Sequence, residues 1–234
     1  MQSWHVIPLN ESHSEQCLSL VIDHFCRRST LHTAANVSSK ELREYLSKHW
    51  YRYACEGPIE SLVAVSDDGT EALGCVIARR FPTLIGSINN LPEKQKPITA
   101  LLQALEAQFL EQSESSARSV LVDLAVVKES ATRLGIYQNL RSVMHQRAAE
   151  AGYEKIYGQL TSVATQHVCV KKLEHKVVSE IRYQDFSYNG TRPFASIESP
   201  RSIQLVEGCL TRTTGSDYNK QEANKKRAAN TALN

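Results

Sequence analysis

The sequence contains no long hydrophobic run. No apolar stretch approaches the ~20 residues that a helix needs to cross a bilayer. The opening stretch, MQSWHVIPLNESHSE, has no basic region followed by an apolar core, so it does not have the pattern of a signal peptide. A net charge of +2 is also too small to indicate nucleic-acid binding by itself. These absences predict a cytoplasmic protein with neither a membrane partner nor a nucleic-acid partner.

Paired cysteine motifs are absent as well. The sequence has six cysteines but no C-x-x-C, and several of them lie in apolar runs. This pattern favours buried free thiols in a reducing compartment over disulfides or a metal site. The N-x-S/T triplets would then have no meaning as glycosylation signals. We expect free thiols at Cys17, Cys26, Cys55, Cys75, Cys169 and Cys209.

Hydrophobic periodicity predicts alternating strands and helices, and so an α/β protein with a mixed sheet. The expected strands cover residues 3–9, 119–127, 153–161, 176–186 and 201–210, with a hairpin at 61–81. The expected helices cover residues 10–28, 38–57, 96–112, 135–152 and 163–175. The spacing of Ser12 with Glu15, and of Ser38 with Glu41, predicts a capping box at the start of each of the first two helices.

The end of the chain differs from the rest in composition. Residues 213–234 are polar, with a basic cluster at 225–227, and lack a hydrophobic pattern. Such a segment cannot bury enough apolar surface to offset the entropy of ordering it. We therefore expect one domain over residues 1–212, followed by a disordered tail.

A single glycine, Gly135, marks the junction between the strand at 119–127 and the next helix. The backbone N–H groups of a helix N-terminus are free, and the helix dipole adds roughly half a positive charge there. Such a junction can hold a diphosphate without a cationic side chain. The loop is neither G-x-G-x-x-G nor a Walker loop, so the signal is weak on its own.

Two segments of the sequence strengthen the prediction of a diphosphate site at Gly135, because they resemble a known family. Residues 123–183 resemble the acetyl-CoA-binding core of the GCN5-related N-acetyltransferase (GNAT) superfamily, whose loop reads Gln/Arg-x-x-Gly-x-Gly/Ala. Thr132, Gly135 and Tyr137 occupy the three motif positions, and only Gly135 matches strictly. Residues 24–46 and 161–166 resemble the arylalkylamine-type branch of that superfamily.

The resemblance implies the GNAT fold: a mixed, mostly antiparallel sheet with helices on both faces, splayed at its central strands. It implies acetyl-CoA as co-substrate. Tyr137 leaves the phosphate cradle open only if its ring turns toward the sheet or the solvent. The donor-binding residues implied by the resemblance are Ala125, Val126, Val127, Thr132, Arg133, Leu134, Gly135, Ile136 and Tyr137.

The resemblance also indicates where catalytic residues should lie. Ser29 takes the place of the glutamate base of the arylalkylamine branch, and a serine cannot act as a base at neutral pH. His32, three residues on, is a candidate for a relocated base near pH 7. Thr165 falls where that branch has a catalytic serine, although a capping hydroxyl explains it equally well. Weaker candidates for the base are Asp23, His24 and Asp123.

The sequence therefore predicts acetyl-CoA-dependent N-acetylation of a small primary amine, of the arylalkylamine or polyamine class, by direct transfer. Two alternatives stay open. One is an acyl-CoA-binding regulator with a degraded catalytic site, and the other is a protein or peptide N-acetyltransferase. We expect a monomer or homodimer.

Overall fold

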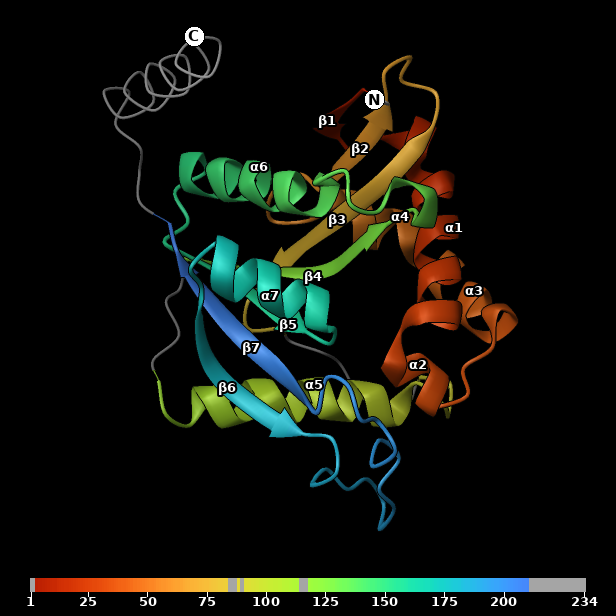
Figure 1. Cartoon of the computed structure of the whole chain (residues 1–234), viewed down its shortest axis with the longest axis vertical. Coiled ribbons are helices and arrows are strands. Elements are labelled where there is room, and N and C mark those ends of the chain that lie inside the picture. Colours follow the sequence, from red (N-terminus) through yellow and green to blue (C-terminus); the bar gives the residue numbers. More distant parts are fainter. Residues whose placement is uncertain (1–2, 84–87, 89–90, 114–117, 211–234) are drawn as a thin grey trace, which may run out of the picture.

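The structure is a computed structural model that describes residues 3–83, 88, 91–113 and 118–210 (Figure 1). The tail predicted to be disordered, at 213–234, lies outside the described residues. Within them, none of the helices combines the length and hydrophobicity needed to cross a bilayer. The six cysteines are all described, and all are free thiols.

A seven-stranded sheet forms the centre of the described part of the chain, in the order β1-β2-β3-β4-β5-β7-β6. Only β4 and β5 run parallel, and each other neighbouring pair is antiparallel. This confirms the predicted mixed, mostly antiparallel sheet. The strands are β1 (Trp4–Pro8), β2 (Leu62–Ser66), β3 (Ala72–Arg80), β4 (Ser119–Val127), β5 (Lys155–Leu160), β6 (Lys176–Arg182) and β7 (Ser202–Cys209).

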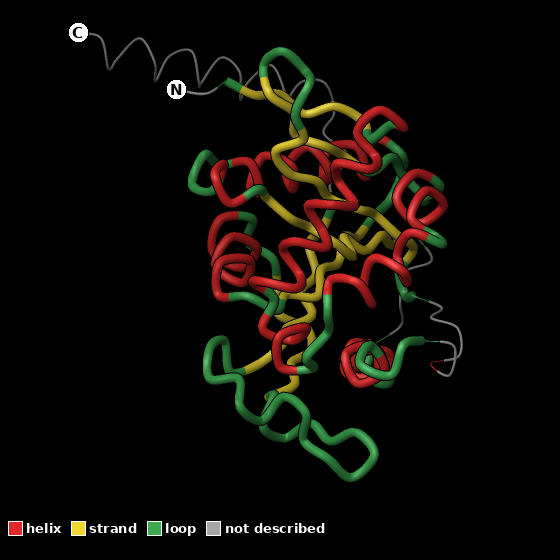
Figure 2. Tube along the Cα trace, turned by 90° about the vertical axis from the view of Figure 1, so that its right-hand side faces the viewer, coloured by secondary structure: helices red, strands yellow, loops and turns green. Residues whose placement is uncertain are grey.

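Helices cover both faces of the sheet (Figure 2). On one face, α1 (Glu11–Arg28) and α5 (Lys96–Leu110) share a core with Ile77, Leu121 and Tyr157. On the other face, α6 (Ile136–Glu150) packs on the alternate strand residues, which include Leu62, Val76, Val120 and Ile156. Alternation of side chains along each strand explains why neighbouring residues belong to different cores.

A third, smaller core lies beside α6 on the same face. It joins α7 (Val163–His167) and the π-helical turn η3 (Val168–Lys172) to strands β5 and β7. Together the two segments match the short helix predicted at 163–175. A 3-10 turn, η2 (Glu129–Ala131), follows β4.

The predicted helix at 38–57 is wrong in its extent. The chain forms α3 (Ser39–Ser47) and α4 (Trp50–Cys55) instead, and an unexpected short helix, α2 (Thr30–Ala34), precedes them. The break accommodates Trp50, which is buried and donates its indole N–H to the carbonyl of Ser14 on α1 at 2.9 Å. A tertiary contact of this kind leaves no signal in the local hydrophobic period.

One of the two predicted capping boxes forms. Ser38 accepts from the backbone N–H of Glu41, and Glu41 accepts from that of Ser38. The other prediction is wrong, because α1 starts one residue before Ser12, with Asn10 as its N-cap residue. Ser12 donates to the Asn10 side chain at 2.6 Å, while Glu15 pairs with an arginine on α3.

The sheet opens between its two central strands. Pairing of β4 with β5 begins at Ser119 with Lys155 and ends at Val122 with Gly158. Beyond this point β4 continues against β3, and β5 continues against β7. The register of β3 and β4 shifts at the same place, where Val122 and Leu124 have β3 partners and Asp123 has none, as in a β-bulge. The predicted splay at the central strands is confirmed.

Candidate active site

A cavity of about 780 Å³ occupies the opening between β4 and β5. Elements from both faces of the sheet line it. The first turns of α6 and the first residues of α7 contribute from one face. The end of α1, α2 and the start of α5 contribute from the other. The cavity therefore crosses the sheet, and two reactants can meet in it from opposite sides.

Apart from the weaker candidates for the base, all but one of the residues expected at the site line this cavity. The exception is Leu134, which packs against the apolar core beneath α6. The others come from four separate segments of the chain, which are brought together only by the fold. They are Ser29, His32, Ala125, Val126, Val127, Thr132, Arg133, Gly135, Ile136, Tyr137 and Thr165.

The loop before α6 has the geometry of an anion cradle. Gly135 is the N-cap residue, with a φ of 76°, and Arg133 has a φ of 69°. Left-handed backbone at Gly135 favours glycine. A Cβ built on Gly135 would meet nothing within 4 Å, so the space in front of this residue is open. The N–H groups of the first helical turn have no intrahelical acceptor and are available to a ligand.

Tyr137 does not close the cradle. Its ring packs against Leu160 and Cys169 in the third core, and its hydroxyl lies 3.3 Å from Cys169 Sγ. Burial raises the pKa of the Tyr137 hydroxyl above its usual value, so it is neutral at pH 7. The ring thus turns toward the sheet, which is one of the two orientations compatible with an open cradle.

Ser29 and His32 form a hydrogen-bonded pair on the other side of the sheet. Ser29 Oγ lies 3.0 Å from His32 Nδ1, and it also caps α2. The His32 ring stacks on Phe25, with centroids 4.6 Å apart. Burial, and then the neighbouring His24, lower the pKa of His32 to about 4. His32 is therefore a neutral imidazole at pH 7, and the expectation that it titrates near pH 7 is corrected by its burial.

The three weaker candidates for a base separate clearly. Asp23 is not among the residues that line the cavity, and it pairs with Arg27 on the exposed side of α1. His24 lines the cavity, and burial, followed by the charge of Arg28, lowers its pKa. Asp123 lies at the bulge of β4, also in the cavity wall, with its carboxylate 3.3 Å from Arg79 Nη1.

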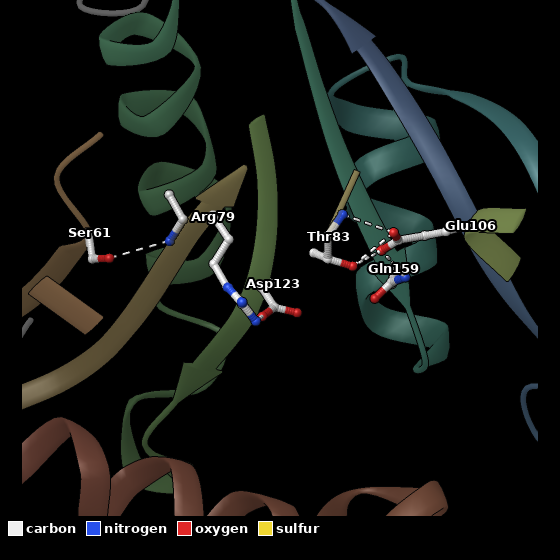
Figure 3. A network of polar contacts seen from close by, with 7 residues as sticks. Ser61, Arg79, Thr83, Glu106, Asp123 and Gln159 are labelled. Atoms are coloured by element: carbon white, nitrogen blue, oxygen red, sulfur yellow. Dashed lines mark hydrogen bonds and ion pairs between the residues drawn. The ribbon is translucent and has the colours of Figure 1, made fainter. Parts of the chain in front are cut away.

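A buried polar network holds strand β5 in place beside the cavity, across the opening from β4 (Figure 3). Glu106 on α5 accepts hydrogen bonds from Thr83, through the backbone N–H at 3.0 Å and through Oγ1 at 2.7 Å. Gln159 on β5 donates to Glu106 Oε1 at 2.9 Å and to the Leu102 carbonyl at 3.3 Å. Burial raises the pKa of Glu106. These contacts hold the Gln159 amide at the cavity wall, a role that the sequence did not predict.

Thr165 is engaged in helix capping as well as lining the cavity. Its hydroxyl lies 2.9 Å from Ser162 Oγ and donates to the Ser162 carbonyl at 3.0 Å. Ser162 is the N-cap residue of α7. The capping interpretation of Thr165 is therefore correct, and the catalytic one stays a prediction. Val170, on the turn that follows α7, packs in the third core, and its apolar side chain can donate no proton.

Comparison with known proteins identifies the fold. No protein-family model matches the sequence, and no curated protein matches it. Solved structures do. The C-terminal condensation domain of Ebony in complex with β-alanyl-dopamine has a TM-score of 0.77 at 14% identity, over 90% of this chain and 100% of that one.

Acetyltransferases with the same architecture match over a similar length. Arylalkylamine N-acetyltransferase 2 from Aedes aegypti has a TM-score of 0.70 at 16% identity, and a polyamine N-acetyltransferase from Drosophila melanogaster has 0.69 at 18%. In both cases the match covers 89% of this chain and 100% of the other. The fold of this chain is thus the GNAT fold, as the resemblance implied.

We expect the burial of His32 to make stability depend on pH. Below pH 6.5 the unfolded chain takes up a proton at this imidazole, whereas the folded chain takes it up only at about pH 4. Stability from this group is present above pH 6.5 and lost as the pH falls, by on the order of 2 kcal/mol between pH 7 and 5. Urea unfolding at both pH values should show a smaller drop for His32→Asn than for the wild type. The exposed His5 is the control, and an equal effect of His5→Asn would contradict this account.

We expect the Tyr137 ring to stabilise the folded chain. Removal of a fully buried aromatic ring destabilises by about 3–5 kcal/mol, and glycine inside a helix costs about 1 kcal/mol more than alanine, so Tyr137→Gly, at a partly buried ring, should lower the free energy of unfolding by about 2–4 kcal/mol. Tyr137→Phe keeps the ring and should stay within about 1 kcal/mol of the wild type. Urea denaturation measures both. Equal stability of the glycine variant would place the ring outside the core.

Proposed function

We propose that this chain transfers an acetyl group from acetyl-CoA directly to a small primary amine, and that the two substrates approach from opposite faces of the sheet. The observation that carries this proposal is the cavity that crosses the sheet between β4 and β5. A thioester and an amine held in one cavity react without a covalent enzyme intermediate. Proximity of this kind lowers the barrier substantially by itself.

The α6 face suits the donor. The cradle at residues 132–137 offers backbone N–H groups and the positive end of the helix dipole to a diphosphate. From there a thioester arm can pass into the opening. Beyond Val122, β4 has no β5 partner, so its edge presents free backbone groups toward the cavity. We assign to the backbone N–H groups near Ala125, Val126 and Val127, which line the cavity, the polarisation of the thioester carbonyl.

The α1 and α5 face suits the acceptor. Its wall is largely apolar and includes Phe25, Leu31, Ile98, Leu102 and Pro200. Among the described residues that line the cavity, Asp123 is the only carboxylate. Asp123 already pairs with Arg79, so it can share its charge with at most one substrate ammonium group. A second cation on the same substrate would meet no further carboxylate in the described lining, which includes Arg28. This composition favours an arylalkylamine over a polyamine.

The comparisons support the same choice without deciding it. The Ebony domain was solved with β-alanyl-dopamine, an amide of an arylalkylamine, and the Aedes aegypti protein is named as an arylalkylamine N-acetyltransferase. The Drosophila melanogaster protein is named as a polyamine N-acetyltransferase that forms N-acetylagmatine. The lining of the cavity in this chain is the reason for preferring the aromatic acceptor.

In the proposed reaction the free amine attacks the thioester carbonyl, and the tetrahedral oxyanion collapses with expulsion of the thiolate. The amine loses a proton and the thiolate gains one. We assign to Ser29, which is hydrogen-bonded to His32, the role of orienting the amine or a water, and to the Thr165 hydroxyl the role of proton donor to the thiolate. An acyl-CoA-binding regulator with the same fold would bind the donor without turnover. A peptide acetyltransferase would need an open groove, whereas this cavity lies between α2, α5 and the chain at Ser199 and Pro200.

Donor binding should depend on Gly135. Gly135→Val should weaken acetyl-CoA binding at least tenfold, about 1.4 kcal/mol, because valine strains the left-handed backbone and crowds the cradle. Gly69 is a matched control, since it has a φ of 72° and equally open surroundings in the β2–β3 turn, away from the cavity. Gly69→Val carries the same strain and should bind normally. Calorimetry with acetyl-CoA compares the two. Equal affinities of the two variants for acetyl-CoA would exclude residues 132–137 as the donor site.

Turnover should depend on the chemistry at Ser29. Ser29→Glu restores a carboxylate where the arylalkylamine branch has one, and positioned bases contribute about 10²–10⁴-fold. We expect kcat/KM for arylalkylamines to rise at least tenfold, and the isosteric Ser29→Gln to give no rise. Thiol release measures both.

The same assay tests His32 and the regulator. If His32 is the base, His32→Gln should lower the rate steeply and remove a limb of the pH profile near its pKa of about 4. Full activity and an unchanged profile would exclude His32. Binding of acetyl-CoA with no turnover in the wild type or any variant would favour the regulator.

A further inference from the structure

Arg141 is a buried cation that none of the steps above uses. It lies on α6, is only 1% exposed, and contributes to the cavity lining. Within the described part of the chain no carboxylate forms an ion pair with it, and its Nε and Nη2 atoms have no hydrogen-bond partner. For comparison, Arg147 on the same helix is partly exposed and pairs with Glu60.

The groups around Arg141 carry no compensating negative charge. Tyr137 is neutral, because burial raises the pKa of its hydroxyl. His145 and His175 stack with ring centroids 4.8 Å apart, and their Nε2 atoms are separated by 3.1 Å. Burial, and then the Arg141 charge, lower the pKa of His145 to about 4 and that of His175 to about 3. The neighbours are therefore uncharged and leave the guanidinium charge unbalanced.

Strand β5 is adapted to the guanidinium. A Cβ on Gly158 would lie 3.1 Å from Arg141 Nη1 and 3.5 Å from Nη2, so a side chain there would crowd the guanidinium. Gly158 is also the β5 member of the last β4–β5 pair, opposite Val122. Arg141 thus sits where the two strands part, at the apex of the opening and on the donor face of the sheet.

Tyr137, which has a side-chain hydrogen bond with Arg141, is neutral, so the buried guanidinium has no counter-charge among the described residues, and a buried charge in that state is strongly destabilising. We propose that Arg141 binds an oxyanion of the acyl donor, a carboxylate or a phosphate, at the apex of the opening. The planar guanidinium matches either group with two parallel hydrogen bonds. The proposal rests on the proposed function in one respect, namely that the donor enters from the α6 face.

The oxyanion has two possible sources on the donor, and ligands can separate them. Acetyl-CoA carries phosphates but no acyl carboxylate. Succinyl-CoA carries both, and S-acetylpantetheine carries neither. The substitution Arg141→Met replaces the guanidinium by an apolar side chain that still fills part of the space. Arg147→Met removes a cation from the same helix outside the cavity and is the matched control.

Calorimetry and thermal unfolding of the whole chain provide the test. Without ligand, Arg141→Met should melt higher than the wild type, because a buried unpaired charge is gone. A loss on the order of tenfold for both CoA thioesters, with S-acetylpantetheine unchanged, identifies a phosphate. A loss confined to succinyl-CoA identifies an acyl carboxylate. Arg147→Met should change none of these affinities.

Other outcomes would overturn the proposal. Equal binding of all three ligands by Arg141→Met and wild type would remove the anion site and leave the proposed function standing. An equal loss for S-acetylpantetheine would show a structural role only. If Arg141→Met does not fold, Arg141→Lys carries the same comparison, because it keeps the charge but loses the bidentate fork.

The two proposals can also fail separately. The wild type could bind none of the thioesters and still be stabilised by pyrophosphate or succinate in an Arg141-dependent way. This result would exclude a CoA thioester as donor and retain the anion site. A wild type that responds to no anion and no thioester would remove both.

Discussion

The end of strand pairing at Val122 and Gly158 is the constraint on which the rest of the structure depends. Up to that point β4 and β5 satisfy one another's backbone groups, and beyond it each strand keeps only its outer neighbour. A sheet interrupted in this way leaves unpaired backbone edges inside the protein, where they are costly unless something binds them. The bulge at Asp123 and the cavity both lie at this point.

Buried polar side chains hold the opening in shape from both faces. On one face the Glu106 carboxylate fixes Gln159 and ties α5 to β5 (Figure 3). On the same face, a hydrogen bond joins Ser29 and His32 at the start of α2. On the opposite face Arg141 stands against Gly158. Rigid polar groups of this kind are more informative about function than exposed ones, because burial makes each of them expensive to retain.

The departures from the family loop have a physical explanation in the third core. Tyr137 stands where the superfamily loop has a small residue. Its ring nevertheless packs against Leu160 and Cys169 and leaves the N-terminus of α6 open. Ser29 stands where the resemblance implied a glutamate, and the apolar side chain of Val170 can donate no proton. The proposed transfer therefore depends more on position and on backbone dipoles than on strong acids and bases.

The sequence by itself determined the order of the strands and the long helices, the capping box at Ser38, the buried central strand and the glycine junction. These are local features, set by hydrophobic period, side-chain hydrogen bonding and backbone freedom. It also pointed to part of the cavity lining, although through a resemblance rather than through spacing.

Only the tertiary structure decided the break before Trp50, the orientation of Tyr137, the neutral state of His32 and the isolation of Arg141. Each of these depends on which distant side chains surround a group, and burial and charge neighbours cannot be read from a one-dimensional period. A lone arginine in a helix normally lies in solvent. Because α6 packs against the sheet and Gly158 has no side chain, the Arg141 guanidinium is instead buried beside Gly158 and lines the cavity.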